Sequence, residues 1–320
     1  MFVEETSPKA GVDYPGTWPS FEAWFPDDEA CRDYLARVRW PDGFVCPQCD
    51  GTDAWRTGRG LWMCHGCGRQ TSVTAGTIFH RSRYPLRTWF AAMWFVCSQK
   101  NGVSALGLQR VIGFGSYETA WAWMHKLRRA MVRPDRDLLG GVGVSVEVDQ
   151  TFHGGRQKAS SRRYSNKHEI VIGVERQHPK GFGRARLAHI DSAERKEALF
   201  GFVQHNLAHG TILYTDGEPI YADLAKKLQI THVPIAMVHS LDPAHEVLPG
   251  VHLVASLLKR WLAGTLHDGV SDRHLDYYLD EFTFRFNRRT SRSRGLLWYR
   301  LVQQAVNTDP HPLASLQHKM

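Results

Sequence analysis

The chain has 320 residues, of which 42% are hydrophobic and 11% aromatic, a composition that excludes a disordered protein and predicts two or three packed domains. Forty Lys and Arg residues against thirty-two Asp and Glu leave a formal net charge of +8. That excess favours a polyanionic partner, nucleic acid before a membrane surface. No apolar run reaches the roughly 18 residues that a bilayer span needs, and the first residues are acidic and polar, unlike a signal peptide. We therefore expect a cytoplasmic protein with no membrane partner.

The N-terminal part of the chain combines a predicted helix with a predicted strand on either side of a cysteine-rich stretch. Residues 20–40 show helical periodicity with an acidic first turn. Residues 69–80 are rich in Thr, Val and Ile, which predicts a strand. We expect these elements to form one domain over residues 18–80.

Four of the six cysteines form two CxxC pairs, "CPQC" and "CHGC", with 14 residues between the pairs. In a reducing compartment such cysteines indicate a metal site before disulfides. Each CxxC turn can place two thiolates about 2.3 Å from one zinc ion, and the residues between the pairs are enough for a short hairpin. The spacing predicts a structural Zn²⁺ ribbon, whose ligands are Cys46, Cys49, Cys64 and Cys67.

Three helices are predicted after the ribbon, over residues 85–99, 104–113 and 116–131. Ser104 and Ser116 stand where N-cap residues are expected. Glycines separate the second helix from the third, whose last turns carry the basic residues Lys126, Arg128 and Arg129.

A short glycine-containing turn before a basic helix is typical of a helix-turn-helix, although a plain three-helix packing unit has the same pattern. The zinc ribbon upstream favours DNA binding. We therefore expect a helix-turn-helix-like DNA-binding segment over residues 85–132, followed by a linker rich in Pro, Gly and charge over residues 133–143.

From residue 144 onward the hydrophobic pattern becomes that of strands alternating with helices. Three predicted strands come first, and then helix, strand, helix, strand and helix follow. This order predicts a mixed sheet with three antiparallel strands and two parallel crossovers. The predicted strands are residues 144–153, 168–176, 185–190, 211–217 and 231–238, and the predicted helices are residues 192–208, 221–228 and 250–264.

Two aspartates follow strands of this predicted sheet. Asp149 comes at the end of the first strand's apolar alternation, and Asp216 at the end of the fourth strand. One aspartate after a strand is usually a turn former. Two carboxylates at the ends of neighbouring strands repel each other unless a divalent cation neutralises them, so the pair indicates a candidate metal site.

Several stretches together resemble the retroviral-integrase-like DDE transposases, and among these the bacterial insertion-sequence transposases. They are "CPQC…CHGCGRQTSVTAGTIFHRSRYPLRTWF", "EVDQTFHGG", "YTDG" and "LLKRWLAGTLHDGVSDRHLDYYLDEFTFRFNRR". The resemblance covers about residues 20–290. It implies a multidomain protein with a zinc ribbon and a helical DNA-binding segment, followed by an α/β RNase H-like catalytic domain, here over residues 144–305 with a tail over residues 306–320.

The resemblance also implies a third metal ligand on a helix after the second aspartate. Thirty-five residues separate Asp216 from His252, which stands where the family usually has Glu and sometimes Asn. Lys259, seven residues later, lies about two helical turns along the same face and matches the family's lysine. We expect His252 to be the third ligand, because imidazole can bind divalent metals. Other acids nearby are Asp242, Glu246, Asp280 and Glu281.

The activity implied is metal-dependent DNA cleavage and strand transfer. Two Mg²⁺ or Mn²⁺ ions would be held by Asp149, Asp216 and His252, with Lys259 touching a phosphate near the cut. The partner would be double-stranded DNA, and the protein would bind the element ends as a homo-oligomer. A run of basic residues is usually a solvated face, but after such a site it also suits DNA binding. The expected DNA contacts are Lys126, Arg128, Arg129, Lys259, Arg260, Arg285, Arg288 and Arg289.

Two other functions fit parts of the sequence. His252 in place of an acid could mark a decayed or domesticated transposase that binds DNA through its zinc ribbon without cutting it. A nuclease of the same fold that acts on RNA–DNA hybrids is the other alternative. The ribbon and helical segment argue against the nuclease, which needs no sequence-reading domain.

Overall fold

The computed structural model describes residues 7–133, 136–154, 168–177, 179–191, 194–235, 247–266 and 270–317. The chain divides into two compact units. The first is formed by Met1–Arg133 together with Thr290–Met320, and the second by Pro134–Arg289. None of the helices in the described ranges is both long and apolar enough to span a bilayer.

The first unit begins with two helices where the sequence pattern predicted one. They are α1 (Trp18–Trp24) and α2 (Asp28–Arg39). Pro26 explains the break, because proline has no backbone N–H to donate and disfavours helical backbone in the residue before it. Asp27 then starts α2 by accepting a hydrogen bond from the backbone N–H of Ala30 over 2.9 Å. The prediction of a single helix over residues 20–40 was therefore wrong.

A small three-stranded antiparallel sheet follows, in the order β1-β2-β3. Its strands are β1 (Ala54–Arg56), β2 (Trp62–Cys64) and β3 (Gln70–Thr71). The last is much shorter than the predicted strand over residues 69–80, because the chain turns repeatedly after Val73. Phe44 stacks on Trp62, their ring centroids 5.6 Å apart, and gives this small module an aromatic core of its own.

Three helices form the next part of the first unit, close to the predicted ranges. They are α3 (Leu86–Ser98), α4 (Ala105–Ile112) and α5 (Tyr117–Arg129). Ser104 and Ser116 are confirmed as N-caps, since each side chain accepts a hydrogen bond over 3.1 Å from the backbone N–H three residues later. Gly113 ends α4 at a φ of 78°, a backbone conformation that glycine adopts without strain.

The helix-turn-helix assignment is not confirmed by this arrangement. A recognition helix needs an exposed face to enter the major groove. In α5, the exposed positions are confined to the two ends, at Tyr117, Glu118 and Arg129, while Met124 and Leu127 in between are fully buried. The observed unit is therefore compatible with the plain three-helix packing that the sequence left open.

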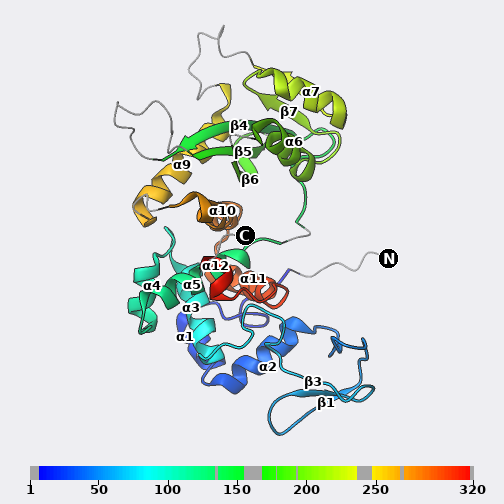
Figure 1. Ribbon diagram of the computed structural model, residues 1–320, viewed down its shortest axis with the longest axis vertical. Helices are drawn as coiled ribbons and strands as arrows, with labels where there is room; N and C mark the ends of the chain where they lie inside the picture. The colour runs from blue at the N-terminus through cyan, green and yellow to red at the C-terminus, as the bar shows by residue number, and fades with distance from the viewer. Residues whose placement is uncertain are drawn as a thin grey trace. The chain divides into compact units, whose positions relative to one another are not determined.

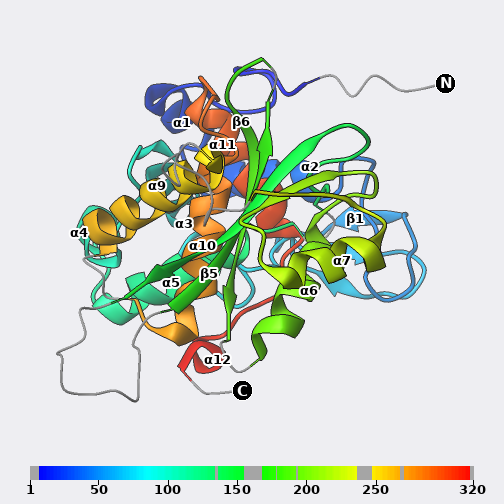
Figure 2. The ribbon, with the colours of Figure 1, turned by 90° about the horizontal axis from the view of Figure 1, so that it is seen from above.

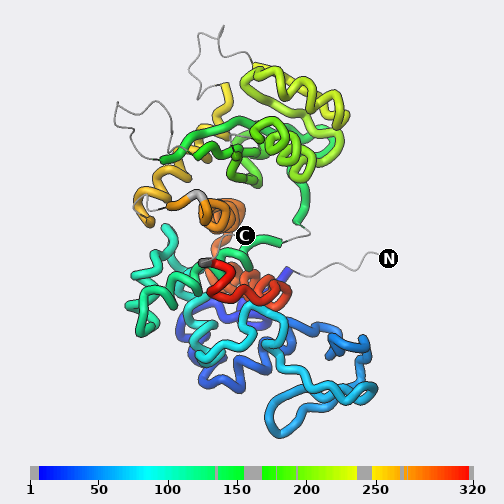
Figure 3. Tube along the Cα trace, in the orientation of Figure 1, coloured from blue at the N-terminus to red at the C-terminus, as the bar shows by residue number. Residues whose placement is uncertain are grey.

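The end of the chain returns to the first unit, where the red helices of Figure 3 lie among the blue and cyan ones. Helix α11 (Arg294–Val306) packs on α2 and α3, and the short α12 (Leu313–Gln317) contacts α5. Trp298 is fully buried and donates its indole N–H to the carbonyl oxygen of Phe90 over 3.1 Å. The second unit thus ends at Arg289, earlier than the expected boundary at residue 305.

The second unit contains a five-stranded mixed sheet with the strand order β6-β5-β4-β7-β8. Strand β5 is antiparallel to both of its neighbours, β4 and β6, whereas β7 runs parallel to β4, and β8 parallel to β7. The succession of three antiparallel strands and two parallel ones confirms the predicted element order. The strands are β4 (Ser145–His153), β5 (His168–Arg176), β6 (Phe182–Ile190), β7 (Ile212–Thr215) and β8 (Thr231–Pro234).

Helices cover both faces of this sheet (Figures 1 and 2). Val146 and Val148 of β4 face a core that includes residues of α6 (Arg195–Asn206) and α7 (Pro219–Leu228). Ile170, Ile172 and Val174 of β5 face the opposite core, built with α9 (Pro249–Leu266) and α10 (Asp272–Phe286). Because side chains alternate along a strand, each strand residue can be assigned to one of these two faces.

Candidate active site and zinc site

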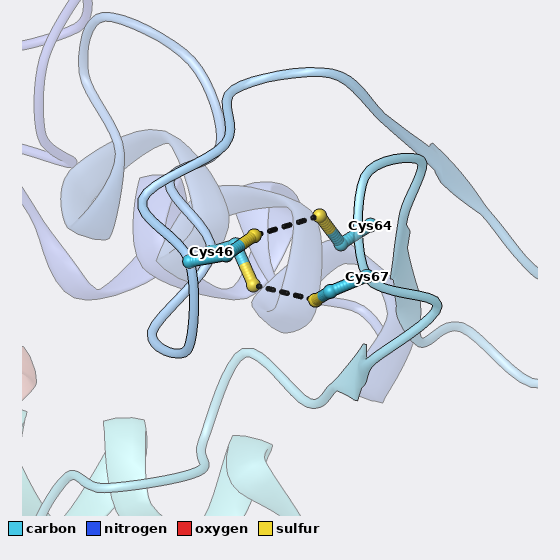
Figure 4. A group of neighbouring side chains, drawn as sticks. Cys46, Cys64 and Cys67 are labelled. Atoms are coloured by element: carbon cyan, nitrogen blue, oxygen red, sulfur yellow. Dashed lines mark hydrogen bonds between the residues drawn. The ribbon is translucent and has the colours of Figure 1, made fainter.

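The four paired cysteines lie together at one end of the small sheet. Their sulfur atoms all fall within 4.8 Å of one another. Across the two pairs, the Sγ atoms of Cys46 and Cys67, and those of Cys49 and Cys64, are each 3.6 Å apart (Figure 4). A tetrahedral zinc ion with bonds of about 2.3 Å would separate its sulfur ligands by about 3.8 Å. The donor set and its spacing therefore fit one structural Zn²⁺.

The two CxxC turns repeat the same backbone geometry. In each turn, the carbonyl oxygen of the first cysteine accepts a hydrogen bond over 3.0 Å from the residue four positions later, Asp50 or Gly68. Both of those residues have a positive φ, 55° and 70°. The backbone N–H of Gln48 makes the largest contribution to lowering the pKa of Cys46 to about 7, whereas hydrogen bonds from the neighbouring thiols raise the pKa of Cys49 to about 12. The case for zinc therefore rests on the spacing of the four sulfur atoms.

Asp149 lies on β4, and Asp216 directly follows β7, the parallel neighbour of β4 in the large sheet. The register between β4 and β7 pairs Val146 with Leu213 and Glu147 with Tyr214. Continuing that register by two residues brings Asp149 level with Asp216, the first residue after β7. Both aspartates alternate with residues of the α6–α7 core, so both side chains belong to the sheet face that α9 covers.

The electrostatic surroundings of Asp149 disfavour its negative charge. The residue is only 8% exposed, and its Oδ1 accepts the backbone N–H of Gln150 over 2.7 Å. Burial is the largest cause that raises the pKa of Asp149 to about 6, and the charges of Asp216 and Glu218 raise it further. A divalent cation at this place would reverse that effect by compensating the gathered carboxylates.

The donor chemistry around Asp149 fits Mg²⁺ or Mn²⁺, which take carboxylate oxygens and tolerate an imidazole nitrogen. In the described part of the chain, the four cysteines are the group of possible metal ligands whose atoms come within 4.8 Å of one another. Asp149, Asp216 and His252 are not gathered that closely.

His252 lies in the first turn of α9, and its backbone N–H donates to the carbonyl oxygen of Leu248 over 3.2 Å. Its side chain is half-buried, and the Nε2 atom of its ring is shielded from solvent. Lys259, seven residues along the helix, is exposed. His252 therefore belongs to the helix that covers the aspartate face of the sheet.

The other acids considered for the third position have separate outcomes. Asp242 and Glu246 lie outside the described residues. Glu281 on α10 is fully buried in an ion pair with Arg285, whose Nη2 lies 2.8 Å from its Oε1. Asp280 is also on α10, and burial is the main cause that raises its pKa to about 7.

Comparison with known proteins identifies both parts of the chain. Residues 138–287 match the ISXO2-like transposase domain, and residues 26–70 match the transposase zinc-ribbon domain. The protein carries an ISXO2-like transposase domain. The matched zinc-ribbon range includes all four paired cysteines, and the transposase range includes Asp149, Asp216 and His252.

Two individual proteins are similar to this chain. One is an uncharacterized protein in transposable element ISH50 of Halobacterium salinarum, which is 25% identical over 278 residues, covering 82% of this chain and 91% of the relative. The other is a chain in the cryoEM structure of a simian T-cell lymphotropic virus intasome in complex with PP2A regulatory subunit B56 gamma. That chain is 15% identical, with 66% of this chain and 70% of the other covered and a TM-score of 0.28.

Two of the basic residues expected to bind DNA are largely buried within their units. Arg128 is only 2% exposed within the first unit. The side chain of Arg285 is 12% exposed and engaged by Glu281. Neither guanidinium offers an exposed surface to DNA in this structure, because each side chain lies on a covered face of its helix.

The remaining expected DNA contacts differ in how free their side chains are. Arg129, Lys259 and Arg260 are exposed. Lys126 is half-buried above the Trp89 ring, and Arg288 lies 4.2 Å from the Phe284 ring centroid. Arg289 is exposed in part, but it donates to the carbonyl oxygens of Phe182, Gly183 and Phe286.

A group of side chains beside the two aspartates was missed from the sequence. Glu218, two residues after Asp216, is held by Arg195, which also pairs with Glu169. Tyr221 is fully buried and accepts a short hydrogen bond from the side chain of Gln150. The only sequence signal for this group is the position of Glu218 and Tyr221, directly after the second aspartate.

Proposed function

We propose that this protein is the DNA transposase of an insertion sequence. It binds the terminal inverted repeats of its element, hydrolyses a phosphodiester at the element end, and joins the freed 3′-hydroxyl to target DNA. The observation that carries the proposal is the parallel register of β4 and β7 in a region that matches a transposase domain. Continued by two residues, that register brings Asp149, whose pKa is raised to about 6, level with Asp216.

The chain's own residues supply the ligands in this proposal. Asp149 and Asp216 hold the metal through carboxylate oxygens, and His252 adds a neutral nitrogen from α9. Bound Mg²⁺ or Mn²⁺ would supply Lewis-acid stabilisation of the attacking and leaving oxygens of the phosphodiester. Lys259, exposed on the same helix, contacts a backbone phosphate near the cut.

DNA binding is assigned to surfaces whose cations are exposed or half-buried. The zinc ribbon and the helices that follow it bind the element end, with Lys126 and Arg129 as phosphate contacts. In the transposase domain, Lys259 and Arg260 on α9 and Arg288 after α10 are assigned as further phosphate contacts. The net charge of +8 supports this partner, and a pair of ends to be joined favours a homo-oligomer on DNA.

The test is single-turnover cleavage of DNA that carries the element's terminal repeat, with Mg²⁺. Asp149→Ala and Asp216→Ala should each abolish cleavage and leave binding of the same DNA within about twofold of the parent, because binding comes from basic residues elsewhere. Asp223→Ala, which removes an exposed carboxylate from α7, is the matched control and should cleave normally.

Two results would contradict the proposal. If Asp149→Ala or Asp216→Ala still cleaves at the parental rate, that residue is not a catalytic ligand. If the parent binds terminal DNA tightly but cuts it in neither Mg²⁺ nor Mn²⁺, the chain is instead a DNA-binding protein derived from a transposase, as the histidine at position 252 allows.

A further inference from the structure

A layer of side chains on the same face of the sheet comes two residues before each of the two aspartates. Glu147 precedes Asp149 by two residues on β4, and Tyr214 precedes Asp216 by two residues on β7. Glu147 and Tyr214 are themselves register partners. Because strand side chains repeat every two residues, both point to the face that α9 covers, as the aspartates do.

Arg176 of β5 contacts both residues of this layer. Its Nε lies 2.6 Å from Oε1 of Glu147, and its guanidinium carbon lies 4.1 Å from the centroid of the Tyr214 ring. Its Nη2 also donates to the carbonyl oxygen of Val247, just before α9, over 3.4 Å. One arginine therefore contacts residues on both aspartate strands and the segment that leads into α9.

The carboxylate of Glu147 holds the beginning of α9. Its Oε2 accepts the backbone N–H of Val251 over 2.9 Å, and Glu147 itself is fully buried. The first N–H groups of a helix have no partner within the helix and favour a negative charge. A buried carboxylate is costly unless it is paired, so the two contacts, with Arg176 and with Val251, explain how Glu147 is tolerated here.

The close approach of this turn to the sheet depends on Gly250. A Cβ atom at that position would lie 2.9 Å from Oε2 of Glu147 and 2.7 Å from the ring of Phe182. Either contact is too short for a real side chain, so any larger residue would push the first turn of α9 away from the sheet.

We propose that Glu147, together with Arg176, is a positioning pair that sets where His252 lies relative to Asp149 and Asp216. Val251, whose backbone N–H donates to Glu147, directly precedes His252. Arg176 contacts Glu147 of β4, Tyr214 of β7 and the carbonyl oxygen of Val247 before α9. The inference rests on the proposed function, because it assigns a role to the pair through the metal site. Its consequence is that loss of Glu147 weakens metal binding although Glu147 is not itself a ligand.

The experiment measures Mn²⁺ binding to the zinc-loaded full chain by electron paramagnetic resonance of free Mn²⁺, without DNA. Glu147→Gln keeps the side-chain volume but leaves one oxygen for two donors, Val251 and Arg176. Gly250→Ala displaces the same turn while it keeps the carboxylate. Bound Mn²⁺ is counted per folded molecule, with the folded fraction taken from unfolding curves, so a partly unfolded variant still gives an affinity.

Glu175→Gln is the matched control. Like Glu147, Glu175 is a buried carboxylate, but it lies on β5. It is 9% exposed and pairs with Arg184 over 2.6 Å. It belongs to the opposite face of the sheet, where its other partner is the backbone N–H of Gly140. This variant should lose stability as Glu147→Gln does, and should bind Mn²⁺ as tightly as the parent.

The expected result is about a tenfold weaker Mn²⁺ affinity for Glu147→Gln and for Gly250→Ala, the size typical of losing a partner that orients metal ligands. Parental affinity in both variants, with binding lost in Asp149→Asn, would overturn the positioning role and leave the proposed function standing. If Asp149→Asn also binds Mn²⁺ as the parent does, the metal site itself is wrong, and the positioning role with it.

Discussion

Arg195 holds the carboxylate of Glu218 with two hydrogen bonds, from Nη1 to Oε1 over 2.6 Å and from Nη2 to Oε2 over 2.9 Å. The same guanidinium donates from Nε to Glu169 over 2.8 Å. Glu218 is one of the charges that raise the pKa of Asp149. Arg195 therefore offsets negative charge that would otherwise accumulate beside the two candidate ligands.

Removing this arginine should destabilise the transposase domain. Arg195→Gln leaves the carboxylate of Glu169, only 7% exposed, without its cation. We expect a loss of about 2 kcal/mol in the free energy of unfolding, because a buried charge without its partner keeps its desolvation penalty. Urea denaturation measures the loss. Glu169→Gln added to Arg195→Gln should recover part of it, and strictly additive losses would contradict the pairing.

The pKa of Asp149 predicts a pH-dependent stability for the protein without Mg²⁺ or Mn²⁺. The pKa of this carboxyl group rises from 3.8 to about 6 on folding, so the folded state favours its protonated form. The resulting contribution to the free energy of unfolding is fully present below about pH 3.8. That contribution is lost as pH rises through about 6. Asp149→Asn should therefore match the parent near pH 4 and exceed it at pH 8 by up to about 3 kcal/mol.

The measurement is the unfolding midpoint of the transposase domain at both pH values, with zinc retained. Saturating Mn²⁺ should then raise the midpoint of the parent and leave that of Asp149→Asn unchanged, because only the parent keeps its ligand. A variant less stable than the parent at pH 8 would show that Asp149 is structurally stabilising, which is the opposite of what its surroundings predict.

The zinc prediction concerns the first unit alone. The parent should contain about one zinc per chain, and Cys64→Ser/Cys67→Ser should contain none, because two thiolates cannot complete a tetrahedral structural site. Elemental analysis of purified protein measures both. Unfolding of the transposase domain should keep its midpoint in the variant, and zinc at the parental level in that variant would rule out the assigned ligands.

His252 should contribute to cleavage as a neutral ligand. His252→Ala should lose most cleavage, whereas His252→Glu should retain it, because glutamate is the ligand that related transposases usually carry and suits Mg²⁺. Cleavage by the parent should fall as the imidazole becomes protonated at lower pH, since a protonated ring cannot coordinate. Rates from pH 5.5 to 8.5 for all three proteins give the comparison. Parental cleavage by His252→Ala in both metals would make His252 only structural.

Local spacing explains why much of this protein could be predicted from its sequence. The two CxxC pairs specify the sulfur cluster because the ligands of each turn are only three residues apart. The alternation around Val146 and Val148 likewise indicates which face of β4 carries Asp149. Both signals lie within a few residues of the chain and do not depend on distant packing.

The features that were missed depend on contacts between distant residues. Trp298 bonds to Phe90, more than 200 positions away in the chain, so the return of α11 to the first unit leaves no local pattern. Glu147 looks like a solvated charge within a strand until Arg176 and Val251 are placed beside it. Arg128 was expected at the surface for the same reason, because only the packed unit reveals that its face is covered.

The most direct test of the central claim, that Asp216 and Asp149 hold a catalytic divalent metal, is a change of ligand chemistry at Asp216. A thiolate is a poor ligand for Mg²⁺ and a better one for the softer Mn²⁺. Asp216→Cys should therefore cut terminal-repeat DNA at least about a hundredfold more slowly than the parent in Mg²⁺ and recover much of that rate in Mn²⁺. Asp216→Ser should stay inactive in both metals. Cleavage by Asp216→Cys at the parental rate in Mg²⁺, or equal rates for the Cys and Ser variants in Mn²⁺, would contradict metal coordination at this position.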